Sequence, residues 1–426
     1  MQLNRTRNFK LDWILIILFL LLVGFGWVNI LSASSTGEIT SILDTSQPFG
    51  KQLIFIGFSI ILIVLILSIE AKFYERFASL IYLGSMVSLL GLFIFGKEVN
   101  GAISWYAIGG MTIQPSEFAK FATALAVAKY ISDLQTNIKD LKDQIKTAII
   151  VLVPAILILL QNDAGSTLVY GAFFFVFYRE GIPKIYLVIG FTIMILAVSS
   201  LKFLALPTTI VVSVLIVLHY IFIRKKNKSI FQPAGLILGV FIITFGVQLF
   251  YQNVLKPHQQ DRISLWLRLE KDPEVLSRMK KREAYNLYQS EQAISSGEFL
   301  GKGFMEGTRT TGKFVPEQHT DYIFSTVGEE WGFLGSSFVV ILFVLLILRI
   351  LHLSELQKSQ FSRVYGYGVA SIFFTHFLIN IGMVMGLIPT IGIPLPFFSY
   401  GGSGLWGFTI LLFIFIKLDS NRINEW

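Results

Sequence analysis

Long windows with almost no charged residues recur along this chain, and they restrict what it can fold into. Each window approaches the length that crosses the hydrocarbon core of a bilayer as a helix, about 17 to 25 residues. Hydrophobic side chains make up 54% of the 426 residues and charged side chains only 15%, unlike the balance of a soluble domain. Because backbone in lipid must satisfy its own hydrogen bonds, the sequence predicts an all-α polytopic membrane protein.

We predict about 12 membrane-spanning helices in one membrane domain, residues 1–426. The windows are 13–31, 52–69, 77–96, 115–131, 147–160, 165–178, 185–201, 206–223, 233–252, 335–348, 364–388 and 402–416. The fourth window contains charged residues, and the fifth and sixth are short. One long loop, residues 253–334, separates the ninth window from the tenth.

The Lys and Arg residues of the short connections predict which side of the membrane each connection faces, because cytoplasmic loops carry an excess of them. Basic residues gather at 5–10, 72–76, 129–146, 179–184, 224–228, 349–363 and 417–422. The short segments on the other side contain only Lys51, Lys97 and Lys202. We therefore predict that both termini are cytoplasmic and that the long loop faces outward.

The charge and the motifs exclude several classes of function. Since the basic residues follow the topology, the net charge of +8 says little about a nucleic-acid partner. We expect membrane lipids and no nucleic acid as partners. The chain has no Cys, no P-loop and no HExxH pattern, and its one GxGxxG, residues 402–407, opens a membrane span with no strand before it. No motif indicates a cofactor or a metal site, although a divalent cation stays an open alternative.

A first polar cluster lies in "NGAISWYAIGGMTIQPSEFAK", residues 100–120, where an outward loop runs into the fourth window. Pro115 suits the first turn of a helix, and Glu117 then faces the positive end of its dipole. Glu117 and Lys120 are three residues apart and share one helix face. The two form an intrahelical ion pair or, alternatively, line a polar cavity.

Two further polar stretches lie near span ends. In "QNDAGST", residues 161–167, Asp163 either caps the next helix or has a role at a site. The stretch "INIGMVMGLIPTIGIPLPFFSYGGSG", residues 379–404, has no charged residue, but its prolines and glycines forbid one continuous helix. We predict a re-entrant loop that borders a site, with a plain tight turn as the alternative.

The fourth stretch, "FVPEQHTDYIFSTVGEEWGFLG", residues 314–335, places several acids just before a span. Asp321 either caps the helix that begins at Tyr322 or acts as a catalytic base. Glu329 and Glu330 suit polar anchors at the membrane boundary. Glu317 receives no assignment.

These four stretches, in this order, resemble motifs of the SEDS family of bacterial membrane glycosyltransferases, and the resemblance covers nearly the whole chain. It implies an enzyme of the bacterial cytoplasmic membrane that polymerises lipid II into glycan strands at the outer face. It also implies a class B penicillin-binding protein, a transpeptidase, as partner. The segments "PEQHTDYIF" and "GEEWGFLG" are most similar to those of the elongation-type members, and the division-type members are the nearest alternative.

The same resemblance implies roles for particular residues. Asp321 matches the catalytic carboxylate of the family, Glu117 and Lys120 match an important pair, and Arg262 matches a basic position near the site. We expect Glu117, Lys120 and Arg262 to bind substrate, with Lys120 and Arg262 as candidates for contacting its pyrophosphate. Asp163, His319 and Ser399 are expected to bind substrate as well. Family members usually have ten spans, so residues 206–252 resemble an inserted helix pair.

Two other classes of function suit a chain of this kind. A lipid II flippase or another transporter would also have many spans and intramembrane charge. A noncatalytic scaffold for cell-wall enzymes would need no essential carboxylate. The sequence has no obvious inverted repeat, which disfavours transport slightly.

Overall fold

The computed structural model describes residues 10–35, 41–99, 101–109, 111–222, 231–270, 272, 274–275 and 285–422. Its helices are α1 (Trp13–Ser34), α2 (Pro48–Ser68), α3 (Ala71–Phe95), α4 (Pro115–Ile131), α5 (Leu141–Leu160), α6 (Ala164–Val169), α7 (Phe173–Glu180), α8 (Ile185–Phe203), α9 (Ala205–Phe222), α10 (Phe231–Asn253), α11 (Pro257–Leu267), α13 (Tyr285–Ser296), α14 (Thr308–Thr311), α15 (Ile323–Glu355), α16 (Gln360–Val384) and α17 (Gly402–Asn421). A short 3-10 helix, η1 (Tyr170–Ala172), joins α6 to α7. The predicted all-α membrane fold is confirmed.

Ten of the described helices are long and apolar enough to cross a membrane. The other two predicted spans, 115–131 and 165–178, are not among these ten helices. Helix α4 has 17 residues and carries the charged pair, and the window at 165–178 is divided among α6, η1 and α7. The span count of twelve therefore stays a prediction.

Helix α15 begins inside the predicted outward loop, at Ile323, and runs for 33 residues. Hydropathy missed its first turns because they contain polar residues that are nevertheless buried, among them Thr326, Glu329 and Glu330. Inside the helix Gly332 has non-helical dihedral angles, φ 60° and ψ −154°. The long loop thus ends about ten residues earlier than the sequence pattern suggests.

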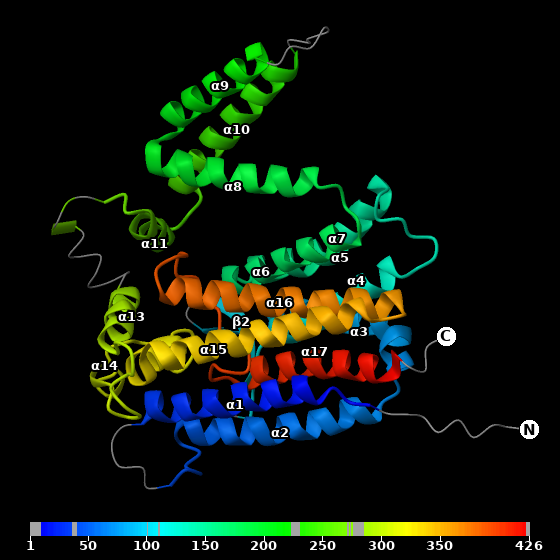
Figure 1. Ribbon diagram of the computed structural model, residues 1–426, viewed down its shortest axis with the longest axis vertical. Coiled ribbons are helices and arrows are strands. Elements are labelled where there is room, and N and C mark those ends of the chain that lie inside the picture. The colour runs from blue at the N-terminus through cyan, green and yellow to red at the C-terminus, as the bar shows by residue number, and fades with distance from the viewer. Residues whose placement is uncertain are drawn as a thin grey trace, which may run out of the picture. The chain divides into compact units, whose positions relative to one another are not determined.

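The described residues divide into two compact units, and each is considered by itself. Unit 1 contains residues 1–182, 289–385 and 390–426, and unit 2 contains residues 183–288 and 386–389. Within unit 1, α4 packs against α3, α5, α16 and α17, and α15, α16 and α17 run beside one another (Figure 1). Helices α16 and α17 are the most enclosed of the candidate spans, with 78% and 72% of their windows buried.

Small residues let the central helices of unit 1 approach closely, as is usual in membrane proteins. Ala119, Ala124 and Ala128 on α4 are all buried. A Cβ at Gly407 on α17 would lie 2.9 Å from the carbonyl oxygen of Glu117. The outer helices instead present large apolar side chains, such as Leu20 and Ile94, to the surroundings, as expected for a surface in contact with lipid.

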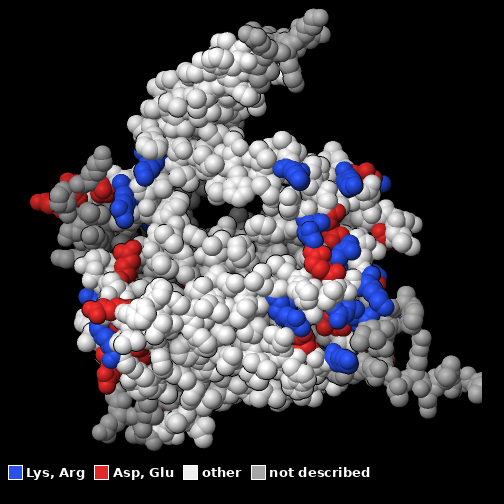
Figure 2. Space-filling model, in the orientation of Figure 1, with Lys and Arg blue, Asp and Glu red and all other residues white. Residues whose placement is uncertain are grey.

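Unit 1 has two polar ends, and Figure 2 shows a largely uncharged zone between them. At one end Arg349 on α15 pairs with Asp12 before α1, at 2.5 Å, and Gln357 donates to Asp419 near the end of α17. At the other end α4, α15 and α17 begin. Of the basic segments that predict the cytoplasmic side, residues 5–9 and 224–228 lie outside the described residues.

A small antiparallel sheet covers part of the opposite end, where the sequence suggests only a loop. Strands β1 (Lys97–Val99), β2 (Ala102–Ile108) and β3 (Met111–Ile113) pair in that order. Tyr106 on β2 faces Ile113 on β3, and the Tyr106 hydroxyl donates to the carbonyl of Ser88 on α3 at 2.8 Å. The sheet thereby fixes the chain that leads into α4.

Unit 2 is built on α8, α9 and α10, which pack against one another. The hydroxyl groups of Thr209 on α9 and Thr244 on α10 hydrogen bond at 2.7 Å and are buried. Helix α11 follows and contains Arg262. The predicted inserted pair, residues 206–252, corresponds to α9 and α10, and its status as an insertion stays a prediction.

The predicted sidedness can be tested because the natural chain contains no Cys. Ser295→Cys on α13 and Gln135→Cys between α4 and α5 each place one thiol at an exposed position. We expect a membrane-impermeant maleimide to label intact cells carrying Ser295→Cys and to label Gln135→Cys only after the membrane is opened. The reverse labelling would place the candidate site in the cytoplasm.

Candidate active site

The chain between α16 and α17 forms a loop buried in protein at the end of unit 1 where α4, α15 and α17 begin. We call residues 390–401 the Pro/Gly loop. Its residues Ile393, Leu395 and Phe398 are at most 1% exposed, and Phe397 packs edge-on against Phe19 of α1 at 5.0 Å. This burial in protein is what the predicted re-entrant loop requires, and the depth of the loop in the membrane stays a prediction.

Three consecutive carbonyls just before α15 accept hydrogen bonds that hold this segment to the Pro/Gly loop and α16. The Tyr400 N–H donates to the His319 carbonyl at 2.9 Å, and the Ser399 hydroxyl donates to the Thr320 carbonyl at 2.6 Å. The Asn380 amide of α16 donates to the Asp321 carbonyl at 2.8 Å. The backbone at Asp321 is therefore fixed to elements about 60 to 80 residues away.

Asp321 itself is half-buried, and its carboxylate lies against the backbone of the Pro/Gly loop. A Cβ built on Gly392 would be only 3.1 Å from Asp321 Oδ2. The N-cap residue of α15 is Tyr322, whose side chain makes no capping bond, so Asp321 directly precedes the cap position and its two alternatives, cap and base, both stay predictions. Because Asp321 is only partly buried, a substrate hydroxyl could reach its carboxylate, as a general base requires.

His319 and Ser399 have neighbours that fix their positions. The His319 ring lies 5.3 Å from the Tyr400 ring, and burial lowers the pKa of the imidazole below its usual value. His319 is therefore neutral at physiological pH. The Ser399 hydroxyl, besides holding Thr320, accepts from the Leu395 N–H at 2.9 Å, so its contacts in the protein are structural.

Glu117 and Lys120 form the predicted ion pair at 2.7 Å, with both side chains almost fully buried. The Lys120 ammonium also lies 2.9 Å from His376 Nε2 and 4.8 Å from the centre of the Phe408 ring. These neighbours surround the ammonium with protein groups from α4, α16 and α17. A buried pair of this kind is costly to break, because either charge alone would be left in a low dielectric.

Asp163 caps α6, as one of its two predicted alternatives states. Its carboxylate accepts from the Ser166 N–H at 2.9 Å and from the Ser166 hydroxyl at 2.8 Å. It also accepts from the Gln114 side chain at 3.0 Å, which joins the starts of α6 and α4. Gly165, two residues after Asp163, lies against the Pro/Gly loop, since a Cβ added there would be 3.0 Å from the Gly392 carbonyl oxygen.

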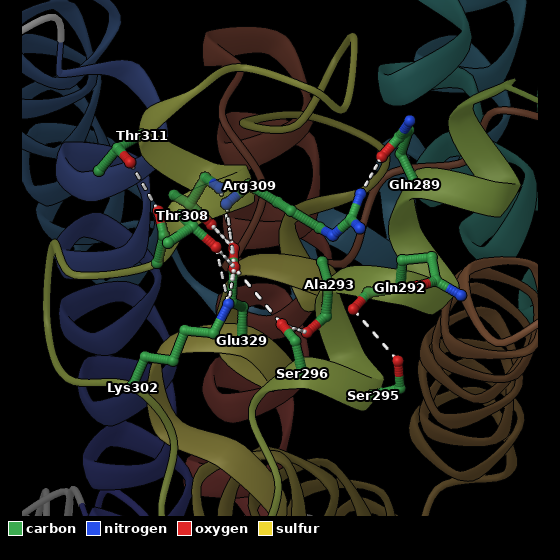
Figure 3. Close-up of polar contacts among 12 residues, drawn as sticks. Gln289, Gln292, Ala293, Ser295, Ser296, Lys302, Thr308, Arg309, Thr311 and Glu329 are labelled. Carbon is green, nitrogen blue, oxygen red and sulfur yellow. Dashed lines mark hydrogen bonds and ion pairs between the residues drawn. The ribbon is translucent and has the colours of Figure 1, made fainter.

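The acids Glu329 and Glu330 are both buried inside the protein, at 0% and 1% exposure. Figure 3 shows Lys302, Thr308 and Arg309 converging on the Glu329 carboxylate. Lys302 Nζ lies at 2.7 Å, and the N–H and hydroxyl of Thr310 each donate to it at 2.8 Å. Glu330 accepts from Ser32 of α1. Both carboxylates therefore make their contacts inside the protein rather than at an exposed boundary, and their structural role stays a prediction.

The Glu329 cluster reaches the segment that holds Asp321. The side chain of Gln318, which is 3% exposed, donates to the hydroxyls of Thr310 and Thr326 at 2.9 Å each. Since Thr310 is held by Glu329, the residue before His319 is fixed from this side as well. Glu317 is exposed and accepts from the Thr320 hydroxyl at 3.2 Å.

The sequence patterns did not predict several residues that lie at this site. His376 and Asn380 lie one turn apart in a span without charged residues, and a pair of polar side chains at that spacing is the signal that could have found them. Gly392 has a φ of +79°, a conformation that favours glycine.

The predicted site residue Arg262 lies on α11 of unit 2. Among the residues that the structure describes, no group of three or more His, Asp or Glu side chains could hold a metal ion.

Comparisons with known proteins match nearly the whole chain. The model of the FtsW/RodA/SpoVE family, described as cell cycle protein, matches residues 12–207 and 184–424. The chain is 32% identical to the peptidoglycan glycosyltransferase RodA of Treponema pallidum (strain Nichols), over 97% of this chain and 98% of that protein. It is 27% identical to the probable peptidoglycan glycosyltransferase FtsW of Bacillus subtilis (strain 168), over 96% and 92%.

The fold is also similar to that of a solved chain. The solved structure concerns the structural coordination of polymerization and crosslinking by a peptidoglycan synthase complex. The two chains superpose with a TM-score of 0.69 at 23% identity, covering 98% of this chain and 99% of the other.

The Glu329 cluster predicts a stability effect. Glu329→Ala should lower the free energy of unfolding by about 2 kcal/mol or more, because it removes the carboxylate from the Lys302 ammonium and leaves the buried Thr310 N–H without its acceptor. Thermal unfolding of the detergent-purified protein measures this, and Glu317→Ala, at an exposed acid nearby, is the control. Equal melting temperatures for the two variants would contradict the structural role of Glu329.

Gly392 predicts an effect on activity. Gly392→Ala places a methyl group against Asp321 and strains a backbone at φ +79°, so we expect a rate at least about tenfold lower in the assay given below. Gly101→Ala is a matched control, since Gly101 has φ +82° and open space around its Cβ position. A similar loss in both variants would mean that backbone strain alone is responsible.

Proposed function

Because the chain belongs to the FtsW/RodA/SpoVE family, we propose that it is a peptidoglycan glycosyltransferase that polymerises lipid II at the outer face of the bacterial cytoplasmic membrane. The observation that carries this proposal is the half-buried carboxylate of Asp321, fixed against the Pro/Gly loop. Both termini are cytoplasmic in this proposal, which places Asp321 outside, where lipid II presents its sugars.

Asp321 acts as the general base of the transfer. It takes the proton from the attacking hydroxyl of one sugar chain as that oxygen forms a bond to the anomeric carbon of the other. The bond from this carbon to the pyrophosphate oxygen breaks, and its electron pair leaves with undecaprenyl pyrophosphate. Because pyrophosphate leaves as a stabilised anion, no second carboxylic acid is needed to protonate it, in contrast to glycoside hydrolysis.

Positive charge near the pyrophosphate would lower the barrier further. The amino-terminal ends of α4, α15 and α17 lie at this end of unit 1, and their dipoles favour an anion. Arg262 is our candidate for a bidentate contact with the pyrophosphate. A divalent cation bound to the phosphate oxygens would supply the same kind of charge.

His319, Asp163 and Ser399 belong to the proposed substrate site for different reasons. His319 lies beside Asp321 and presents a neutral imidazole, which can donate or accept a hydrogen bond with a sugar hydroxyl. Asp163 and Ser399 act through structure: the first fixes the starts of α6 and α4, and the second fixes the Thr320 carbonyl.

An elongation role has more support than a division role. The identity to the RodA protein, 32%, exceeds that to the FtsW protein, 27%. A class B penicillin-binding protein is the proposed partner, which is supported by the similarity to a chain of a peptidoglycan synthase complex. Such a partner would crosslink the strands that this chain polymerises.

The test is formation of glycan polymer from fluorescent lipid II by the full-length protein in detergent micelles. A micelle has no second leaflet, so a flippase or a scaffold would give no product. Asp321→Asn keeps the size of the side chain but loses the proton acceptor, and we expect the rate to fall about 100- to 10,000-fold. Glu317→Gln changes an exposed acid four residues away and should retain the rate. Normal polymerisation by Asp321→Asn would place the base elsewhere.

A further inference from the structure

The buried pair Glu117–Lys120 is connected to the segment of the candidate base through side chains of α16. Lys120 Nζ lies 2.9 Å from His376 Nε2, and His376 Nδ1 lies 3.1 Å from the Pro394 carbonyl oxygen. His376 is 1% exposed. One imidazole therefore joins a charged pair on α4 to the backbone of the Pro/Gly loop.

The ammonium group determines the tautomer of this imidazole. A Lys ammonium can only donate hydrogen bonds, so His376 Nε2 must be the acceptor in the contact with Lys120. The proton of the neutral ring is then on Nδ1, which donates to the Pro394 carbonyl. Glu117 holds Lys120 in place at 2.7 Å, and the pair thereby maintains the bond to the loop.

Asn380, one helical turn after His376, holds the carbonyl that precedes that of Pro394 in the loop. Its amide nitrogen donates to the Ile393 carbonyl at 2.6 Å and to the Asp321 carbonyl at 2.8 Å. Asn380 is fully buried, at 0% exposure. Two successive loop carbonyls and the carbonyl of the candidate base are thus all held by one face of α16.

We propose that His376 and Asn380 are positioning residues of the glycosyltransferase, and that Glu117 and Lys120 act through His376 rather than on the substrate. The two α16 side chains hold residues 392–394 against Asp321, whose carboxylate lies beside Gly392. Without the bond from His376, the Pro394 carbonyl loses its partner and the wall beside the carboxylate shifts. This inference rests on the proposed function of Asp321 as the base.

Two substitutions at one position separate the two bonds of the imidazole. His376→Asn places an amide N–H near the position of Nδ1, so it can retain the bond to Pro394 and lose the contact with Lys120. His376→Gln places an amide oxygen near the position of Nε2, so it can retain the contact with Lys120 and lose the bond to Pro394. We expect His376→Gln to lower kcat about 10- to 100-fold with KM within about twofold, and His376→Asn to retain more activity.

The role in positioning is tested by combining variants in the full-length protein. If His376 acts by placing Asp321, then His376→Gln should cost nothing further in the Asp321→Asn background. An equal fold loss in both backgrounds, or a change confined to KM, would overturn the proposal. Asn380→Leu, which removes both amide bonds at similar size, should behave like His376→Gln, and it serves as the second variant if His376→Gln does not elute as a folded protein.

Hydrogen exchange tests the same proposal without activity. In His376→Gln we expect faster exchange of the amides at residues 391–400 and unchanged exchange in the interior of α4. Unchanged exchange in the loop would overturn the positioning role. If instead the wild-type protein forms no polymer while the loop responds as expected, it is the proposed function that fails.

Discussion

Non-helical backbone can remain in the interior of a membrane protein only if its carbonyl and N–H groups find partners there. The Pro/Gly loop meets this requirement with side chains from several helices: Asn380 and His376 of α16, and Gln52 of α2, which accepts from the Gly401 N–H at 3.1 Å. Because Asn380 also bonds to the carbonyl of Asp321, one side chain both satisfies the buried loop and places the candidate base. The site depends on the loop for this reason.

A second constraint acts from the other side of the same segment. Residues 298–303 pair through their backbone with the interrupted part of α15: the Lys302 N–H donates to the Glu329 carbonyl at 3.0 Å, and the Phe333 N–H donates to the Glu298 carbonyl at 2.9 Å. Gly332 allows this close approach, since a Cβ there would collide with the Gly301 nitrogen. The Glu329 carboxylate accepts from the Thr310 N–H of α14. The chain between α14 and Asp321 is therefore held by the Glu329 cluster on one side and by the Pro/Gly loop on the other.

The sequence predicted the elements of the site better than their connections. Hydropathy and helix spacing were sufficient for the membrane class and the Glu117–Lys120 pair, because both depend on residues close in the chain. The contact between Lys120 and His376 joins positions 256 residues apart, and no local pattern indicates which helices meet. The cap alternative for Asp321 already assumed a helix from Tyr322, but the hydropathy window began only at residue 335. The first turns of α15 contain polar side chains that are buried by protein rather than by lipid, and hydropathy does not register this difference.

The sequence distances within the site also have a consequence for the order of assembly during synthesis. Glu117 and Lys120 are three residues apart, so each charge has its partner as soon as α4 forms, and this local pairing lowers the cost of placing them in the membrane. Their contact with His376, and the bonds that fix residues 319–321, require segments that leave the ribosome much later. Domains fold largely as their chain becomes available. The base can therefore reach its final position only after α16 and the Pro/Gly loop have been inserted, and a chain that stops before α16 would have the acid without its site.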